Sequence, residues 1–167
     1  WGGAGCEAGI RALAALQEDP STREWVVKAM VEKEERMGVL IELLPKARKK
    51  KGYYYSEKIL GLLSTLCLSS QAGRAFVRAH PLSLPSVLRT LLLLSDRANE
   101  LSVTILWCLL CAPSSSSSSS ISSSDPNPNP DVGPDAHHAL AHEASRLGAS
   151  QKLLVVAQMD CSTMTKK

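Results

Sequence analysis

The sequence predicts an all-α fold built from repeated helical units, and three observations carry this prediction. Apolar residues recur at helical spacing through almost all of the 167 residues. Alternating strand patterns are absent, and β-branched residues are sparse outside the helical spacing. One helical pattern also recurs at a fixed offset along the chain. Because aromatic residues make up only 4% of the chain, aliphatic side chains must form the core.

Amphipathic stripes predict four helices in the first half of the chain, at residues 22–33, 36–45, 55–68 and 71–79. The third has the fullest stripe, with apolar residues at i, i+3, i+4, i+7 and i+8. The residues expected to face inward are Val26, Ala29 and Met30; Met37, Leu40, Ile41 and Leu44; Ile59, Leu62, Leu63, Leu66 and Cys67; and Ala72, Ala75, Phe76 and Ala79.

Two further helices are predicted at 85–94 and 96–112. Pro85 suits the first position of a helix, where its missing N–H is not needed. The helix over 96–112 is apolar nearly all round, which predicts burial from several sides. Ser95 and Asp96 precede it as expected caps, because their side chains can accept hydrogen bonds from free backbone N–H groups.

The C-terminal part predicts helices at 136–147 and 151–159. Ala136, Leu140, Ala144 and Leu147 mark the apolar face of the first. Gly148 is expected to end it in a left-handed conformation. Ser162 or Thr163 is expected to cap a further helix that the chain does not finish.

A segment rich in serine and proline interrupts the helical pattern at 113–134. Such a composition buries too little apolar surface to offset the entropy of ordering, so a disordered insertion is predicted. The predicted organisation is therefore helical repeats over 1–112, the insertion over 113–134, and a last, truncated repeat over 135–167.

The helices recur as a unit of about three. The pattern that begins near Glu57 begins again near Glu100, an offset of 43 residues, and an earlier partial cycle fits 7–45. This offset lies within the roughly 40–47 residues of armadillo and HEAT repeats. Because each unit buries its apolar faces against its neighbours, the sequence predicts an armadillo-type right-handed superhelical solenoid.

The ordered set of repeat-boundary motifs resembles the C-terminal armadillo-repeat half of plant U-box ubiquitin-protein ligases. The turn at Lys33–Arg36 departs from the family, which usually has glycines there. No part of the chain matches the U-box itself. The residues that carry the resemblance are Arg23–Lys28, Val39–Leu44, Ser56–Leu60, Gly73–Phe76, Ser95–Glu100, Ile105–Leu109, Lys152–Ser162 and Thr165–Lys167.

The resemblance implies a division of labour in protein ubiquitination. A U-box, missing here, would recruit the ubiquitin-conjugating enzyme, and the armadillo region would bind a protein substrate or a regulatory kinase. Such a ligase supplies no covalent nucleophile and accelerates transfer by proximity. The chain is therefore expected to hold no catalytic residue and no cofactor. A stand-alone armadillo adaptor without ligase activity is the alternative, and a helical enzyme is disfavoured.

Repeat geometry selects the candidate partner-binding residues. In armadillo solenoids the third helix of each unit lines a concave groove, and here those helices are 55–68 and 96–112. Trp107 is a candidate groove aromatic, although its apolar neighbours favour a role in the core. The polar residues expected to face a bound peptide are Glu57, Lys58, Arg97, Asn99 and Glu100.

Other side-chain patterns favour ordinary structural roles. Cys108 and Cys111 form a lone pair, whereas a structural zinc site usually needs four ligands, so core packing is favoured. His138 and His142 share a helical face without the residue order of a metalloprotease, which favours a solvated surface and no metal. No glycine elbow frames a nucleophile in the serine run.

Charge and cysteine content limit the remaining classes. A net charge of +3 is too small to predict nucleic-acid binding, and no apolar run is long enough to span a membrane. The basic cluster at 46–51 is more typical of a solvated loop than of a nuclear-import signal. Five scattered cysteines favour a reducing compartment, so a cytoplasmic protein is expected, with a nuclear location as the alternative. The start at Trp1 indicates a fragment of a longer protein.

Overall fold

The computed structural model describes residues 4–45, 53–93, 95–111 and 135–164. Within these ranges all regular structure is helical and no strand occurs, which confirms the predicted all-α class. The helices are α1 (Ala4–Glu18), α2 (Pro20–Val31), α3 (Glu34–Leu43), α4 (Tyr53–Ser69), α5 (Gln71–Ala79), α6 (Ser83–Thr90), α7 (Asp96–Leu110), α8 (Asp135–Arg146) and α9 (Ala149–Met164).

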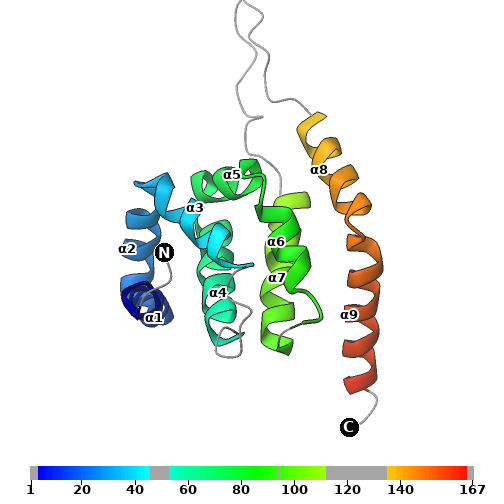
Figure 1. The fold of residues 1–167 in the computed structure, drawn as a ribbon, viewed down its shortest axis with the longest axis horizontal. Coiled ribbons are helices and arrows are strands. Elements are labelled where there is room, and N and C mark those ends of the chain that lie inside the picture. The colour runs from blue at the N-terminus through cyan, green and yellow to red at the C-terminus, as the bar shows by residue number, and fades with distance from the viewer. Residues whose placement is uncertain (1–3, 46–52, 94, 112–134, 165–167) are drawn as a thin grey trace, which may run out of the picture.

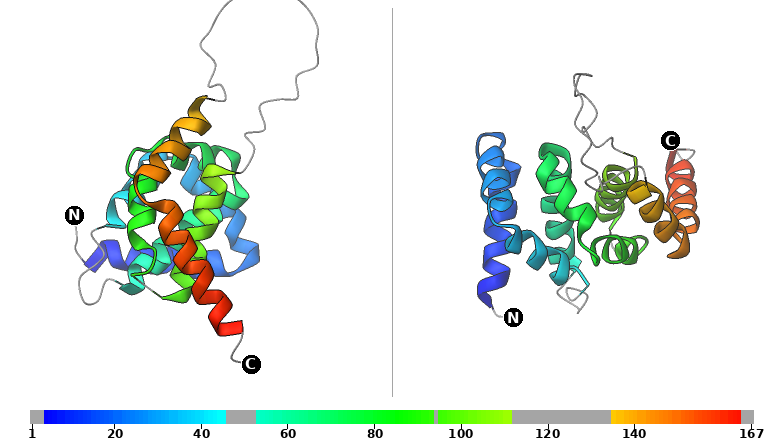
Figure 2. Two further views of the ribbon diagram at one scale, coloured as in Figure 1. Left: turned by 90° about the vertical axis from the view of Figure 1, so that its right-hand side faces the viewer. Right: turned by 90° about the horizontal axis from the view of Figure 1, so that it is seen from above.

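The helices follow one another in layers from the N-terminal to the C-terminal end (Figure 1). Seen from above, α1 and α2 form one end, α4 and α5 follow, then α6 and α7, and α8 and α9 form the other end (Figure 2). Helix α4 lies in the middle and packs against α1 on one side and α7 on the other. The long helices α1, α4 and α7 therefore form a stacked series that runs through the molecule.

Burial confirms the 43-residue repeat between α4 and α7. Four residues on one face of α4 and their counterparts 43 positions later are all buried in the same core cluster or beside it. The two helices thus occupy the same place in successive units, and they share one register. The matched pairs are Ile59 and Ser102, Leu62 and Ile105, Leu63 and Leu106, and Leu66 and Leu109.

Helices α2 and α5 begin with the same two polar interactions. Asp19 and Ser70 cap these helices by accepting hydrogen bonds from backbone N–H groups. The fourth residue of each helix is an arginine, which donates to a carbonyl near the end of the preceding long helix. Arg23 Nε lies 3.1 Å from the oxygen of Gln17, and Arg74 Nε lies 2.9 Å from that of Cys67. Each arginine therefore donates to a carbonyl that is left without a backbone partner at the C-terminal end of the preceding helix.

The inward face of α5 differs from the prediction. Ala72, Ala75 and Ala79 are exposed, whereas Gly73 and Val77 are buried. A Cβ on Gly73 would lie 3.2 Å from the carbonyl oxygen of Leu66, so the absence of a side chain permits this close approach. The alanine spacing was misleading because alanine tolerates exposure and glycine gives no hydrophobic signal.

Two predicted helix boundaries are also wrong. Helix α6 begins at Ser83 and ends at Thr90, so Pro85 is its third residue and the chain leaves the helix four residues early. The cause is Leu92, which has a left-handed φ of 66°. Helix α9 continues to Met164 without the predicted break before Ser162, since no proline or glycine interrupts that stretch.

The turn between α2 and α3 needs no glycine. Glu32 has a φ of −60° and Lys33 a φ of −132°, so ordinary residues make the connection where the resembling family usually has glycines. Gly148, in contrast, has the predicted left-handed φ of 76° after α8. Helix α1 is an additional element that the predicted helices did not include.

Some predictions concern residues outside those that the structure describes. The serine- and proline-rich segment 113–134 and the basic cluster 46–51 lie there, so the domain boundaries stay predictions. In the described part of the chain, no helix is both long and apolar enough to cross a membrane.

The loop between α6 and α7 generates a stability prediction. Asn99, only 7% exposed, accepts a hydrogen bond from Leu92 N–H at 2.9 Å and so stabilises a left-handed backbone that costs a leucine about 1–2 kcal/mol. We expect Asn99→Ala to lower the free energy of unfolding by about 1–2 kcal/mol in urea titrations followed by circular dichroism. Glu100→Ala, next to it and exposed, should change stability by less than about 0.5 kcal/mol. Equal effects of the two substitutions would contradict this role.

Candidate protein-binding surface

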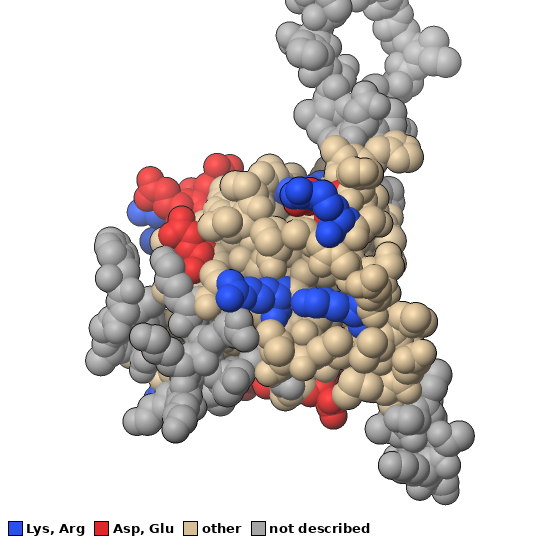
Figure 3. All heavy atoms as spheres, turned by 45° about the vertical axis from the view of Figure 1, so that its right-hand side comes forward, with Lys and Arg blue, Asp and Glu red and all other residues tan. Residues whose placement is uncertain are grey.

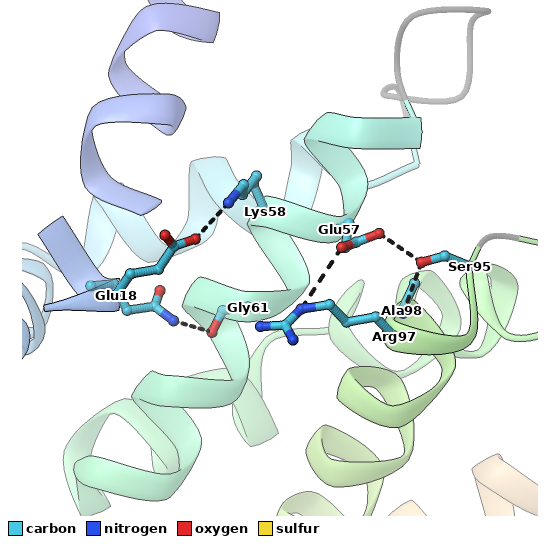
Figure 4. Close-up of polar contacts among 8 residues, drawn as sticks. Glu18, Glu57, Lys58, Gly61, Ser95, Arg97 and Ala98 are labelled. Carbon is cyan, nitrogen blue, oxygen red and sulfur yellow. Dashed lines mark hydrogen bonds and ion pairs between the residues drawn. The ribbon is translucent and has the colours of Figure 1, made fainter. Parts of the chain in front are cut away.

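Three of the predicted site residues form a polar row across the long helices (Figure 4). Lys58 Nζ of α4 lies 2.7 Å from Glu18 Oε1 of α1. Glu57 of α4 faces the next helix, where Arg97 Nε lies 3.8 Å from Glu57 Oε1 and Ser95 Oγ donates to Glu57 Oε2 at 2.6 Å. The row therefore joins α1, α4 and α7 through adjacent residues of α4.

The outer partners of the row, Glu18 and Arg97, are exposed to solvent, which limits the energy of both ion pairs. The hydrogen bond from Lys58 lowers the pKa of Glu18, whose carboxylate lies at the surface. Exposed ion pairs of this kind contribute little to stability. Their main effect is to set the register between neighbouring helices, because each acidic group has a donor only when the helices are aligned.

Sequence reasoning missed the residue that reinforces this row. Gln17 of α1 reaches α4, where its Nε2 donates to the Gly61 oxygen at 3.0 Å and to Thr65 Oγ1 at 2.6 Å. These bonds connect residues more than 40 positions apart. A single polar residue near the end of a helix gives no pattern that would have predicted them.

Asn99 and Trp107 take places other than those expected. Asn99 is buried and fixes the α6–α7 loop, and it is also among the residues that line a groove. Trp107 is 56% exposed, so the expected core role for it is wrong. Apolar residues surround it in the sequence, but none of the described helices covers it.

A groove of about 550 Å³ lies between α7 and α9. Its walls are mainly aliphatic, and two carboxylates, from Asp96 and Glu100, stand along its α7 side. Among the described residues, neither carboxylate has an ion-pair partner. The α7 wall further contains Asn99, Leu101, Val103 and Thr104, and the α9 wall contains Leu153, Val156, Ala157 and Met159.

The wider surface is sparsely charged on one side. Figure 3 shows a largely uncharged face on which Lys and Arg side chains form two separate groups, with acidic side chains at its left edge. Exposed apolar side chains on α9 add to this character, among them Leu154, Val155 and Met159. Exposed apolar area of this kind is typical of protein-interaction sites.

The side chains that could support chemistry are dispersed or buried. His138 and His142 are exposed on α8, and the described residues contain no group of three or more His, Cys, Asp or Glu that could hold a metal ion. Cys108 is buried, whereas Cys111, three residues on, is exposed. Burial raises the pKa of the Cys67 thiol to about 12 and raises that of Cys108 as well.

Repeated three-helix units, stacked through equivalent long helices with a 43-residue offset, define a helical-repeat protein of the armadillo type. The family model of the plant U-box protein ARM repeat region matches residues 4–121, which is more than half of the chain. The chain therefore belongs to this family, and its ARM repeats indicate a role in protein–protein interaction. No curated protein and no solved structure gives a significant match.

The polar row generates a prediction on charge reversal. Glu57→Lys would face Arg97 and remove the acceptor of Ser95, so we expect a loss of about 1 kcal/mol in the free energy of unfolding. Glu100→Lys, at the matching position of α7, meets no described cation or donor and should cost less than about 0.5 kcal/mol. Parallel urea titrations of the two variants measure the difference, and a larger loss for Glu100→Lys would refute this assignment of roles.

Thiol reactivity generates a further prediction. Raising the pKa of Cys67 from 9.0 to about 12 reduces its thiolate fraction at pH 8 by about 1,000-fold. In a chain with Cys6 and Cys161 replaced by serine, we expect one fast reaction with Ellman's reagent, at Cys111, and two further thiols only in guanidinium chloride. Cys111→Ser should abolish the fast phase. A second fast thiol in the native chain would show that the core around Cys67 is open.

Proposed function

We propose that this chain is the substrate- or regulator-binding region of a U-box ubiquitin-protein ligase. Membership of the plant U-box ARM repeat family is the observation that carries the proposal. The open groove between α7 and α9 supports it, because stacked helices with exposed apolar side chains provide a surface for another protein. The partners are a protein substrate or a regulatory kinase.

In this proposal the chain contributes binding and positioning. A U-box elsewhere in the full-length protein would recruit the ubiquitin-conjugating enzyme with its ubiquitin thioester. The ARM repeats would hold the target so that a lysine of the target lies near that thioester. Holding the reactants together raises the rate of transfer by proximity, without a nucleophile from the ARM repeats.

Of the residues predicted to contact a partner, Arg97, Glu100 and Trp107 are exposed, and of these only Arg97 has an ion-pair partner among the described residues. Glu57, Lys58 and Arg97 are engaged between helices, and we assign them a positioning role. Unpaired buried thiols at Cys67 and Cys108 are consistent with a reducing compartment, so we propose a cytoplasmic location.

Autoubiquitination tests the ligase proposal. We expect the full-length transcript product to form ubiquitin chains when it is incubated with ATP, ubiquitin, activating enzyme and a panel of conjugating enzymes. Residues 1–167 alone should form none, because the chemistry belongs to the U-box and its bound enzyme. The full-length Glu100→Arg variant should retain autoubiquitination, since the substitution lies on the binding surface.

Omission of the conjugating enzyme provides the negative control, and a known ligase provides the positive control. If the full-length product is inactive with every conjugating enzyme while the positive control is active, the ligase proposal fails. The chain would then be a stand-alone ARM repeat adaptor.

A further inference from the structure

The groove between α7 and α9 lies at the last step of the stacked series of helices among the described residues. Helix α1 packs on α4, and α4 packs on α7. At each of these steps an acidic residue of one helix meets a donor of the next, as Glu18 meets Lys58 and Glu57 meets Arg97. Each of these two contacts between long helices therefore combines apolar packing with an ion pair between an acidic and a basic residue at its edge.

Helix α7 has an acidic residue at the position equivalent to Glu57 of α4. Glu100 lies 43 positions after Glu57, in the register that the buried pairs of α4 and α7 establish. Glu57 accepts a hydrogen bond from Ser95, the N-cap of α7, and forms an ion pair with Arg97. Glu100, in contrast, is exposed and has no ion-pair partner among the described residues. Glu100 is thus placed to accept from a cation on a helix that packs against α7.

Apolar burial shows the same difference between the two helices. Leu60 and Ser64 of α4 are buried. Their counterparts 43 positions later are Val103, which is half-buried, and Trp107, which is more than half exposed. Since the positions match, the difference arises from the neighbour: α7 packs closely on this side of α4, whereas α9 leaves a groove along the same side of α7.

The lining of the groove has the chemistry to bind the apolar face of a helix. Its volume of about 550 Å³ is lined by aliphatic side chains of α7 and α9, such as Val103 and Val156, with Asp96 and Glu100 along one side. An apolar groove with an acidic edge complements an amphipathic helix that has a basic residue beside its apolar face.

We propose that the α7–α9 groove binds an amphipathic helix of a partner protein, with an Arg or Lys in the first two turns of that helix paired to Glu100. The bound helix contacts the side of α7 that matches the side of α4 on which α7 packs, and α9 forms the opposite wall of the groove. The inference deepens the proposed protein-binding function and names the chemistry of the partner. A helix of this kind buries the half-covered side chains of α7 and α9 and neutralises the acidic edge.

The probe for this test is a helix that already makes the equivalent contact. A fluorescein-labelled peptide of residues 94–111, with both cysteines replaced by serine, contains Arg97, the residue that meets Glu57 in the chain. We expect saturable binding of this peptide to the chain of residues 1–167, measured by fluorescence anisotropy. The Glu100→Arg chain should bind it at least about fivefold more weakly, which corresponds to about 1 kcal/mol.

A charge swap makes the test specific. An Arg97→Glu peptide should bind the unaltered chain about fivefold more weakly and should regain affinity for the Glu100→Arg chain. Glu24→Arg, an exposed reversal on α2, is the matched control and should leave the affinity unchanged. Val156→Lys, in the apolar wall, should also weaken binding, and circular dichroism would verify that each variant is folded.

Three outcomes would overturn the proposal: no saturable binding, equal binding by the Glu100→Arg chain, or no recovery in the swapped pair. Self-association of the chain that Glu100→Arg abolishes, observed by analytical ultracentrifugation, would instead identify a second copy as the occupant. The peptide test involves no ubiquitin transfer. Peptide binding without autoubiquitination would therefore refute the ligase proposal alone, and the reverse result would refute the groove proposal alone.

Discussion

The packing of α4 is the constraint on which the rest of the structure depends. This helix has apolar residues around most of its circumference, including Ile59, Leu60, Leu63 and Cys67, and all four are buried. A helix without a polar face is stable only when neighbours cover several sides. Helices α1, α5 and α7 provide that cover. Truncation of one such leucine to alanine typically costs 2–5 kcal/mol, more than the whole exposed row of ion pairs can contribute.

The ends of the helices create a second requirement, because each helix leaves free carbonyls at its C-terminal end. In this chain, basic side chains from neighbouring helices donate hydrogen bonds to such carbonyls. Arg78 of α5 donates to the oxygens of Cys108 and Leu109 at the end of α7, each at 3.0 Å, and Lys152 of α9 donates to Leu88 of α6 at 2.6 Å. Partial burial lowers the pKa of Arg78. These bonds connect successive units. Each basic side chain therefore satisfies carbonyls at the end of one helix and also holds its own helix against that end.

The sequence was most informative where apolar residues repeat at helical spacing. It predicted the buried stripes of α3 and α4 correctly, because leucine, isoleucine and methionine mark a face strongly. It failed for α5, where a buried glycine and exposed alanines reverse the expected signal. It also failed at Leu92, since a left-handed leucine depends on Asn99 seven residues later. The contacts of Gln17 and Arg78 had no local signal at all, because their partners are 30 or more residues away.

Trp107 shows why a binding surface in a repeat protein is difficult to distinguish from a core. Periodicity reports which face of a helix is apolar, and that face is the same whether or not another helix covers it. Helices α4 and α7 share a register, yet Ser64 is buried and Trp107 is exposed, because α7 packs closely on α4 whereas α9 leaves a groove beside α7. The apolar residues that build the interior of one unit therefore become, one unit later, the surface offered to a partner. Glu57 is paired between two helices, whereas Glu100, at the equivalent position one unit later, is accessible. The position of a residue in the series of repeats therefore determines whether it holds the fold together or is available to a partner.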